Sequence, residues 1–322
     1  MVQATVGVHD LVFSDLKFDG STLGNNAVHC KPGSYRIQFL RNTVQNTGAA
    51  GFSGSGCDYV TVDHNLFYHV GYGTGWGSAV TFNTFVWADT AAGFHSYVTN
   101  NIISGTSDES TYHSDGNGII MDGGGNAPTV LIANNLVYEN GGRCIHNFNV
   151  QNVWIVNNTC YKNGLDSRLG ATGEFTNYNA QNIHLINNIA LAWTGRYPYK
   201  VQSSSAVSFS RNSAWGGLTS IVPSTVLSDP TQLRTTQPEF LNAPSVDATQ
   251  DQQQRQALAP WLTGTSFAEL AGAPLVDSGT DPQTAPGVTT ALLTGLKAYV
   301  LRDLAGTARP QAGVFDFGVF ER

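Results

Sequence analysis

The segments "NVWIVNNTCYKNG" at residues 152–164 and "NIHLINNI" at residues 182–189 share one pattern. Each starts with a polar residue, continues with mostly apolar residues, and reaches a paired Asn-Asn before a second short apolar stretch. The pattern recurs at least seven times, with its second polar residue at Asn42, Asn65, Asn101, Asn135, Asn158, Asn188 and Asn212. A polar pair that returns in this way indicates an internal repeat.

The spacing of the repeat predicts the fold. Consecutive Asn positions are 23, 36, 34, 23, 30 and 24 residues apart, so three steps carry insertions into a basic period of about 23. Such a period is typical of a solenoid, in which one turn cannot bury its apolar face alone. The repeat is rich in β-branched and aromatic residues between Gly, Asn, Asp and Ser, so its elements are strands and turns. The sequence therefore predicts an all-β fold, a right-handed parallel β-helix of about eight to nine coils within residues 7–217.

The Asn pairs are interpreted as part of the scaffold. An Asn at the same bend of every coil can adopt a left-handed backbone conformation. Its amide can then form hydrogen bonds with the Asn above and below, which satisfies polar groups that the solenoid buries. We therefore expect an asparagine ladder and exclude these residues from a site.

Composition excludes several classes of function. The 322 residues include 16 Lys and Arg against 23 Asp and Glu, and this net charge of −7 argues against nucleic acid as a partner. No apolar run reaches the ~18 residues of a membrane span. The start, "MVQATVGVHDLVF", lacks the features of a secretory signal and resembles a coil already in progress, so we expect N-terminal turns to precede it. The protein is expected to be a monomer.

The four Cys, at positions 30, 57, 144 and 160, show no spacing typical of a zinc site. Their places within the repeat favour small core residues, so we expect buried thiols, with a disulfide as the alternative.

The repeat stops after residue 217, which divides the chain into coils over residues 1–217 and a cap over residues 218–322. The second part contains a polar run at residues 247–260 and one helical period at about residues 292–304. A solenoid needs covered ends, because an open terminal coil is an exposed sheet edge. We therefore interpret this segment as a cap without catalytic residues.

The C-terminal stretches "AGAPLVDSGTD" and "RDLAGTARPQAGVFDFGVFER" resemble the terminal segment of many secreted bacterial β-helix proteins. The coils over residues 7–215 resemble the pectate-lyase-like β-helix superfamily. This resemblance implies a secreted or periplasmic protein that binds a polysaccharide along its parallel sheet. The enzymes of that superfamily include polysaccharide lyases and glycoside hydrolases.

Two insertions point to the place of a site, since loops on one face of a repeat protein usually form its binding surface. Residues 71–94 bring Tyr72, Trp76 and Trp87, and residues 104–128 bring His113, Asp115, Asn117 and Asp122.

Alignment through the Asn pairs predicts which residues are neighbours. It places Asn147 on Asn177, Phe148 on Tyr178 and Asn149 on Asn179. For the preceding coil, a slip of one residue places Asp122 beside His146, whereas no slip places it beside Ile145, and we adopt the first alternative. The predicted cluster is Asp115, Asn117, Asp122, Arg143 and His146, with Lys162 beyond the next bend.

The favoured function is a polysaccharide lyase that cleaves a uronate-containing glycan by β-elimination. This reaction requires neutralisation of the sugar carboxylate and a base that removes the adjacent proton. Arg143, or Ca²⁺ held by Asp115, Asn117 and Asp122, would neutralise the carboxylate. His146 or Lys162 would be the base. Because the net charge repels a polyuronide, a lyase also needs calcium or a local basic strip.

Two other functions remain open. A carbohydrate-binding module for a neutral plant glycan such as xylan would use the flat faces of aromatic residues and rows of amides. Its expected substrate contacts are Tyr72, Trp76, Trp87, His113, Asn147, Phe148 and Tyr178. A glycoside hydrolase would instead use Asp115 and Asp122 as paired carboxyl groups, which need a separation of ~5 to 9.5 Å.

Overall fold

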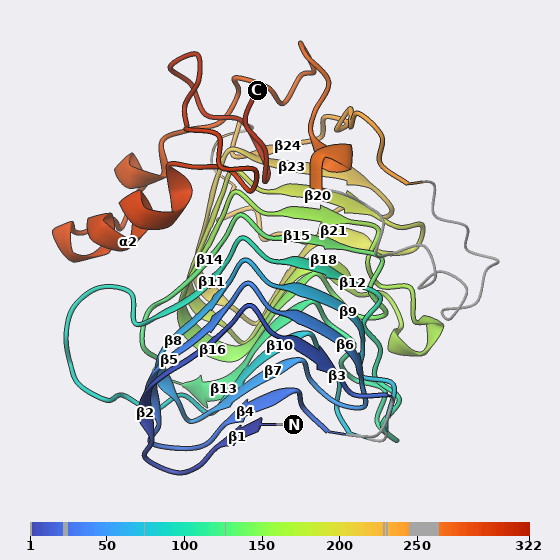
Figure 1. Ribbon diagram of the computed structural model, residues 1–322. Helices are drawn as coiled ribbons and strands as arrows, with labels where there is room; N and C mark the ends of the chain where they lie inside the picture. The colour runs from blue at the N-terminus through green and yellow to red at the C-terminus, as the bar shows by residue number, and fades with distance from the viewer. Residues whose placement is uncertain are drawn as a thin grey trace.

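The computed structural model describes residues 2–21, 25–73, 75–125, 127–227, 229, 231–244 and 264–322. The described chain forms a parallel β-solenoid of about eight turns followed by a C-terminal segment with one α-helix (Figure 1). The predicted polar run at residues 247–260 lies outside the described residues. Within the described ranges, no helix is long and apolar enough to cross a membrane.

Each coil contributes strands to three walls of the solenoid, which we name A, B and C. Wall A consists of β1 (Val2–Ala4), β4 (Val28–Cys30), β7 (Phe52–Ser55), β10 (Val80–Asn83), β13 (Ile119–Gly125), β16 (Ile145–Val156), β18 (Gly173–Tyr178) and β21 (Tyr197–Gln202). Wall B consists of β2 (His9–Ser14), β5 (Tyr35–Leu40), β8 (Asp58–Asp63), β11 (Ser96–Thr99), β14 (Val130–Ala133), the second half of β16, β19 (Gln181–Ile186) and β22 (Ser205–Ser210). The unbroken β16 joins the two walls into one 15-stranded sheet.

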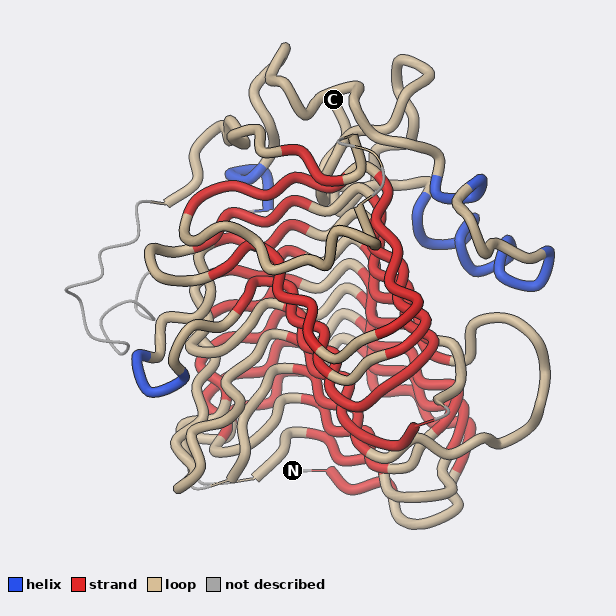
Figure 2. Tube along the Cα trace, turned by 180° about the vertical axis from the view of Figure 1, so that it is seen from behind, coloured by secondary structure: helices blue, strands red, loops and turns tan. Residues whose placement is uncertain are grey.

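Wall C is a separate 9-stranded sheet. It consists of β3 (Lys17–Asp19), β6 (Thr43–Thr47), β9 (Leu66–Val70), β12 (Ile102–Ser104), β15 (Leu136–Tyr138), β17 (Thr159–Tyr161), β20 (Ile189–Ala192), β23 (Asn212–Gly216) and β24 (Leu233–Arg234). Alternate residues of all three walls point inward and form one continuous apolar core. The three walls are seen from behind in Figure 2.

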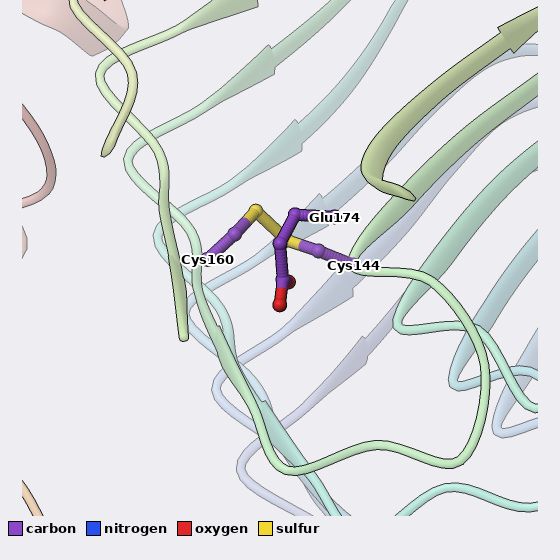
Figure 3. A group of neighbouring side chains, drawn as sticks. All are labelled: Cys144, Cys160 and Glu174. Carbon is purple, nitrogen blue, oxygen red and sulfur yellow. A yellow bond between two sulfur atoms is a disulfide. The ribbon is translucent and has the colours of Figure 1, made fainter. Parts of the chain in front are cut away.

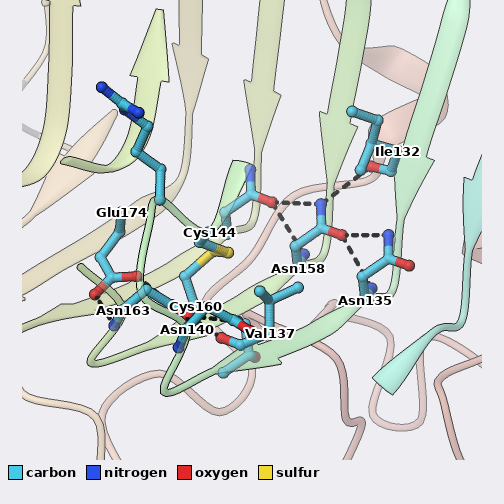
Figure 4. Close-up of a disulfide and its surroundings, with 12 residues drawn as sticks. Ile132, Asn135, Val137, Asn140, Cys144, Asn158, Cys160, Asn163 and Glu174 are labelled. Atoms are coloured by element: carbon cyan, nitrogen blue, oxygen red, sulfur yellow. Dashed lines mark hydrogen bonds between the residues drawn. A yellow bond between two sulfur atoms is a disulfide. The ribbon is translucent and has the colours of Figure 1, made fainter. Parts of the chain in front are cut away.

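The expected asparagine ladder is confirmed. Six bonds join the seven ladder Asn residues from Asn42 to Asn212, and in each the side-chain Nδ2 of one Asn donates to Oδ1 of the next at 2.9 to 3.1 Å. Backbone N–H groups of the ladder donate to the same oxygens, as for Asn135 and Asn158 at 2.9 Å. Figure 4 shows these two residues beside one of the disulfides.

The two members of an Asn pair have different structural roles, whereas the sequence analysis expected both roles of one residue. The left-handed conformation belongs to the first member, with φ of 55° at Asn134 and 54° at Asn187, and the ladder belongs to the second. The first member also holds the C-terminal segment. Asn134 Nδ2 donates to the Tyr299 carbonyl at 2.6 Å, and Asn187 Nδ2 donates to the Thr280 carbonyl at 2.7 Å.

The expectation of free thiols was wrong, because Cys30–Cys57 and Cys144–Cys160 are disulfides. The second pair joins the start of β16 on wall A to β17 on wall C within one coil. The two residues are only 16 apart in sequence, and the closure of the coil brings their Cα atoms to 5.7 Å.

The C-terminal segment covers two of the three walls. The helix α2 (Thr290–Val300) confirms the predicted helical period, although it ends before residue 304. Its Leu292, Leu296 and Val300 pack on outward residues of wall B, including Leu131 and Trp154.

The rest of this segment, which includes the short 3-10 helices η3 (Gly264–Phe267) and η4 (Pro282–Thr284), lies mainly on wall C. Phe267, Val319 and Phe320 pack on Leu136, Tyr138 and Tyr161. No apolar cluster of the described residues joins this segment to the outward face of wall A, which therefore carries the open surface.

Candidate functional site

The outward face of wall A is hollowed into a groove of about 690 Å³. Its lining includes Trp76, Asp115, Asp122, Arg143, His146 and Phe148. A second hollow of about 230 Å³ shares Arg143, His146 and Phe148 with the groove and continues to Tyr178 and Lys200. The two hollows therefore form one surface along the solenoid axis, which we call the wall A groove.

Strand register builds the floor of this groove. One outward row runs through His29, Ser53, Thr81, Ile120, His146, Thr176 and Lys200. The adjacent outward row runs through Ser55, Asn83, Asp122, Phe148, Tyr178 and Gln202. Because neighbouring strands lie about 4.8 Å apart, the first row spans roughly 29 Å.

The adopted pairing of Asp122 with His146 was wrong, and so was its alternative. Asp122 pairs with Phe148, and His146 pairs with Ile120. The register shifts by one residue between Asp122 and Gly125, and by three residues in all between Asp122 and Val130. Asp122 and His146 are thus diagonal neighbours in the same groove. The other three predicted pairings, of residues 147, 148 and 149 with 177, 178 and 179, are confirmed.

His146 lies on the groove floor and is only 6 % exposed. Its Nδ1 is buried without a hydrogen-bond partner among the described residues, and its ring lies 5.7 Å from that of Phe148. Burial, assisted by the charge of Arg143, holds the pKa of His146 well below its usual 6.5. The ring is therefore neutral at pH 7 and can accept a proton.

Arg143 is held at the groove by the loop before β13. Its Nη1 donates to the Ser114 carbonyl at 2.9 Å, while its buried Nε has no partner among the described residues. Burial lowers the pKa of Arg143 to about 10, so the guanidinium remains charged at neutral pH. A buried donor without a partner is costly, and an anionic ligand would satisfy it.

Asp108 organises the same loop. One of its carboxylate oxygens accepts the N–H of Ser114 at 2.8 Å and that of Asp115 at 2.9 Å. Burial and the charge of Asp108 raise the pKa of Asp115 to about 7, and burial raises the pKa of Asp122. Both carboxyl groups line the groove.

The expected calcium ligands do not fit that ion well. Asn117 is 0 % exposed, and its Oδ1 already accepts the N–H of Arg143 at 3.0 Å. Ca²⁺ takes six to eight oxygen ligands, usually including carboxylates, and of the three expected ligands only Asp115 and Asp122 line the groove. We therefore assign no step to calcium.

The described residues contain one group of three potential metal ligands, Cys144, Cys160 and Glu174 (Figure 3). The two sulfurs form a disulfide and so cannot bind a metal as thiolates. Glu174 instead accepts the backbone N–H and the Nδ2 of Asn163 at 2.8 and 2.6 Å, at the end of a short second ladder from Asn140 (Figure 4). This group belongs to the scaffold.

The predicted substrate contacts are only partly brought together. Trp76, which is 59 % exposed, and Phe148 and Tyr178, whose rings stack at 5.6 Å, line the groove. Asn147 points inward and is 0 % exposed, so its amide serves the scaffold through a 2.8 Å bond to Asn177.

The remaining predicted contacts do not line the groove. The Tyr72 hydroxyl donates to the Gly105 carbonyl at 3.1 Å, and His113 Nδ1 bonds to the Asp108 carbonyl at 2.9 Å. Trp87 borders a different hollow, at the corner of walls A and B.

Lys162 was wrongly placed in the cluster. It follows β17 on wall C, where its Nζ lies 4.9 Å from the ring centre of Tyr161 and 5.7 Å from that of Trp193. Lys162 has a left-handed backbone conformation at the bend after β17, and it does not line the wall A groove. The catalytic role predicted for it therefore has no support from its position.

Sequence reasoning missed Lys200, which lines the groove two coils beyond His146. The ladder contained the signal: His146, Thr176 and Lys200 each precede a ladder Asn by the same interval, at Asn158, Asn188 and Asn212. The hollow shared by Arg143, His146 and Lys200 has no carboxylate in its described lining. This end of the groove is thus locally basic, despite the net charge of −7.

No known protein family matches the chain, and no curated protein matches it in sequence.

Proposed function

We propose that this protein is a polysaccharide lyase that cleaves a uronate-containing glycan in the wall A groove. The observation that carries the proposal is the hollow lined by Arg143, His146 and Lys200, which combines two cations with a neutral imidazole. It is the local basic strip that a lyase of acidic net charge requires.

The residues have distinct roles in the proposed reaction. Arg143, assisted by Lys200, pairs with the sugar carboxylate and makes the proton on the adjacent carbon more acidic. His146 removes that proton, the electron pair forms a carbon–carbon double bond, and the glycosidic oxygen on the next carbon departs. The departing oxygen takes a proton from water. Burial and, to a smaller extent, the charge of Arg143 keep His146 neutral, and a bound substrate carboxylate would offset the contribution of Arg143 when the imidazole takes the proton.

The shape of the surface supports a polymeric substrate. The outward row of roughly 29 Å can contact several consecutive sugars. Phe148 and Tyr178, nearly parallel at 11°, offer flat faces next to the basic hollow. Such a face packs on the apolar side of a sugar ring, while the polar groups contact its hydroxyls. The resemblance of the coils to the pectate-lyase-like superfamily agrees with this reading, and we propose membership on that basis.

We also propose that the protein acts in a secreted or periplasmic compartment and works as a monomer. Its two disulfides fit an oxidising environment.

A glycoside hydrolase is the second candidate, because one observation favours it. The pKa of Asp115, raised to about 7, suits a carboxyl group that donates a proton to a glycosidic oxygen. Asp122 would then be the second carboxylate of the pair.

A product assay on uronate polymers and neutral glycans separates these functions. A lyase raises both the ultraviolet absorbance of an unsaturated sugar and the number of reducing ends. A hydrolase raises only the reducing ends, and a binding module raises neither.

Arg143→Lys tests the basic hollow. A lysine keeps the charge but cannot form two parallel bonds to a carboxylate, so we expect a loss of about tenfold or more in kcat/KM. Arg302→Lys is the matched control, since Arg302 bonds to the Gly306 carbonyl in the C-terminal segment. Full activity of Arg143→Lys on a uronate polymer would contradict the assigned role.

A further inference from the structure

We infer that the hollow beside Trp87 binds a neutral side branch of the polysaccharide whose backbone lies in the wall A groove. This inference rests on the proposed function and narrows its substrate to a branched glycan. The hollow, which we call the corner pocket, has a volume of about 420 Å³. Its lining includes Tyr35, Arg36, Gly56, Asp58, Trp87 and Asp89.

The corner pocket opens next to the groove. Ser55 lines the groove and the next residue, Gly56, lines the corner pocket. Likewise, Asn83 lines the groove, and the same loop reaches the corner pocket at Val86. Because consecutive Cα atoms are about 3.8 Å apart, a branch that leaves a backbone sugar near Ser55 has only a short distance to cross.

Aromatic faces give the corner pocket its affinity for sugar. Trp87 is 37 % exposed, with its ring edge-on to His95 at 5.1 Å. The Tyr35 ring is stacked with His9 at 4.8 Å and has the Arg36 guanidinium 4.5 Å from its centre, so these neighbours fix its orientation and Trp87 supplies the main aromatic surface of the pocket. Two fixed aromatic residues with charged neighbours are suited to a ligand that has apolar faces and a polar rim.

The charged groups select a neutral branch. One oxygen of Asp89, Oδ1, accepts the Tyr59 hydroxyl at 2.7 Å and the Ala91 N–H at 2.9 Å, while no described residue donates to Oδ2. These bonds hold the pKa of Asp89 below its usual value, so it is a carboxylate that can accept sugar hydroxyls. Arg36 is already paired with Asp10 at 2.5 Å. The pocket therefore repels a second uronate and favours a sugar rich in hydroxyl groups.

The loop that carries Trp87 is fixed in place. His95 and Asp58, 1 % and 2 % exposed, form a buried pair at 2.8 Å, and Asp58 also accepts the Ala88 N–H at 2.8 Å. These bonds anchor the loop that carries Trp87 to the start of β8 on wall B. The volume lies at the small end of the range for ligand pockets, which suits one or two sugars.

Equilibrium binding tests the inference in the His146→Ala background, where bound glycan is not cleaved. The probes are a uronate-backbone polymer with galactose branches, one with arabinose branches, and each of them trimmed enzymatically to its backbone. We expect at least one branched polymer to bind about tenfold more tightly than its trimmed form, a difference equal to about 1.4 kcal/mol. Adding Trp87→Ala should remove this difference, and Trp87→Phe should restore most of it.

Trp215→Ala is the matched control, because Trp215 is 38 % exposed on wall C. Equal binding of branched and trimmed polymers would overturn the inference, as would a branch preference that survives Trp87→Ala. A Trp87→Ala defect of equal size on both forms would assign Trp87 to backbone binding instead. Failure of the proposed function is seen separately, as absence of unsaturated product from the unmodified protein.

Discussion

The inward residues of walls A, B and C form one apolar core, but the outward side chains of wall A differ in polarity from those of walls B and C. Walls B and C carry apolar residues such as Trp154 and Tyr138 at outward positions, and the C-terminal segment covers them. Wall A carries His146, Asp122 and Lys200 at the equivalent positions and is hollowed into a groove. In this solenoid, outward polarity and the lack of a cover from the described C-terminal residues together locate the candidate site.

The covered surface and the open groove should contribute to different properties of the protein. Removing an apolar side chain under the C-terminal segment should cost stability, because it leaves a cavity. Removing a polar side chain from the groove should cost activity, since few core contacts depend on it. Substitutions on the two surfaces should therefore affect different measurements.

The largest expected effect is that of His146→Ala on turnover. If His146 is the base of the proposed reaction, its loss should lower the rate by about 10²- to 10⁴-fold while the solenoid stays folded. The measurement is the initial rate of unsaturated product formation, with the thermal unfolding midpoint as the check on folding. His64→Ala removes a half-exposed histidine directly after β8 of wall B and should keep full activity. Retention of the rate in His146→Ala would place the chemistry elsewhere.

Leu296→Ala should have the next largest effect, and on stability. Leu296 is 0 % exposed where α2 packs on wall B, so its truncation should cost about 2 to 5 kcal/mol of unfolding free energy. Chemical denaturation measures this loss, and activity below the unfolding transition should be unchanged. Thr294→Ala, on the exposed side of the same helix, is the control. Equal stability of the two variants would show that α2 does not hold the cover on wall B.

Asn158→Ala should cost about 1 to 3 kcal/mol, because buried partners on both sides lose a hydrogen bond. Asn158 Oδ1 accepts from Asn135, and its Nδ2 donates to Asn188 and to the Ile132 carbonyl. The thermal unfolding midpoint is the readout, with the exposed Asn242→Ala as control. The ladder lies inside the solenoid, so this loss should not depend on the C-terminal segment that covers walls B and C. An unchanged midpoint would show that the ladder contributes little to stability.

The smallest expected effect is a pH dependence at the loop that carries Trp87. Burial acts against the charged form of His95, but its bonds to Asp58 and the Ala91 carbonyl outweigh burial and raise its pKa above 6.5. A raised folded-state pKa contributes stability that is fully present below pH 6.5 and is lost as the pH rises through the folded value. The stability advantage of the unmodified protein over His95→Gln should therefore shrink above pH 6.5, as followed by thermal unfolding at several pH values. A constant difference would show that the pair does not titrate in this way.

The sequence predicted the solenoid well, because each ladder Asn repeats a local pattern that needs no knowledge of distant contacts. It predicted the disulfides poorly. Cys144 and Cys160 meet only after the chain has passed along two walls, and their sequence spacing does not match the ladder period. The C-terminal helix was predicted from its periodicity, but its docking on wall B was not. The docking depends on outward apolar residues of wall B such as Leu131, which the sequence analysis did not identify as a covered surface.

The groove itself was predicted in part. Asp115, Asp122, Arg143 and His146 were identified from their chemistry and do line one surface. Their register was wrong, because the chain between Asp122 and Val130 carries three more residues than the matching part of β16, and the sequence pattern does not show where they are absorbed. Lys162 was misplaced because the sequence does not show on which side of a bend a side chain emerges.

The position of His146 in its row has a consequence for product release. Four groove-lining positions of the row precede it, from His29 to Ile120, and two follow it, Thr176 and Lys200. Under the proposed reaction, a cut at His146 divides the bound chain into a longer and a shorter fragment. The shorter fragment keeps fewer contacts and so dissociates first, while the longer one stays in place. This asymmetry would allow a retained chain to advance for another cut, with the release of short products of uniform size.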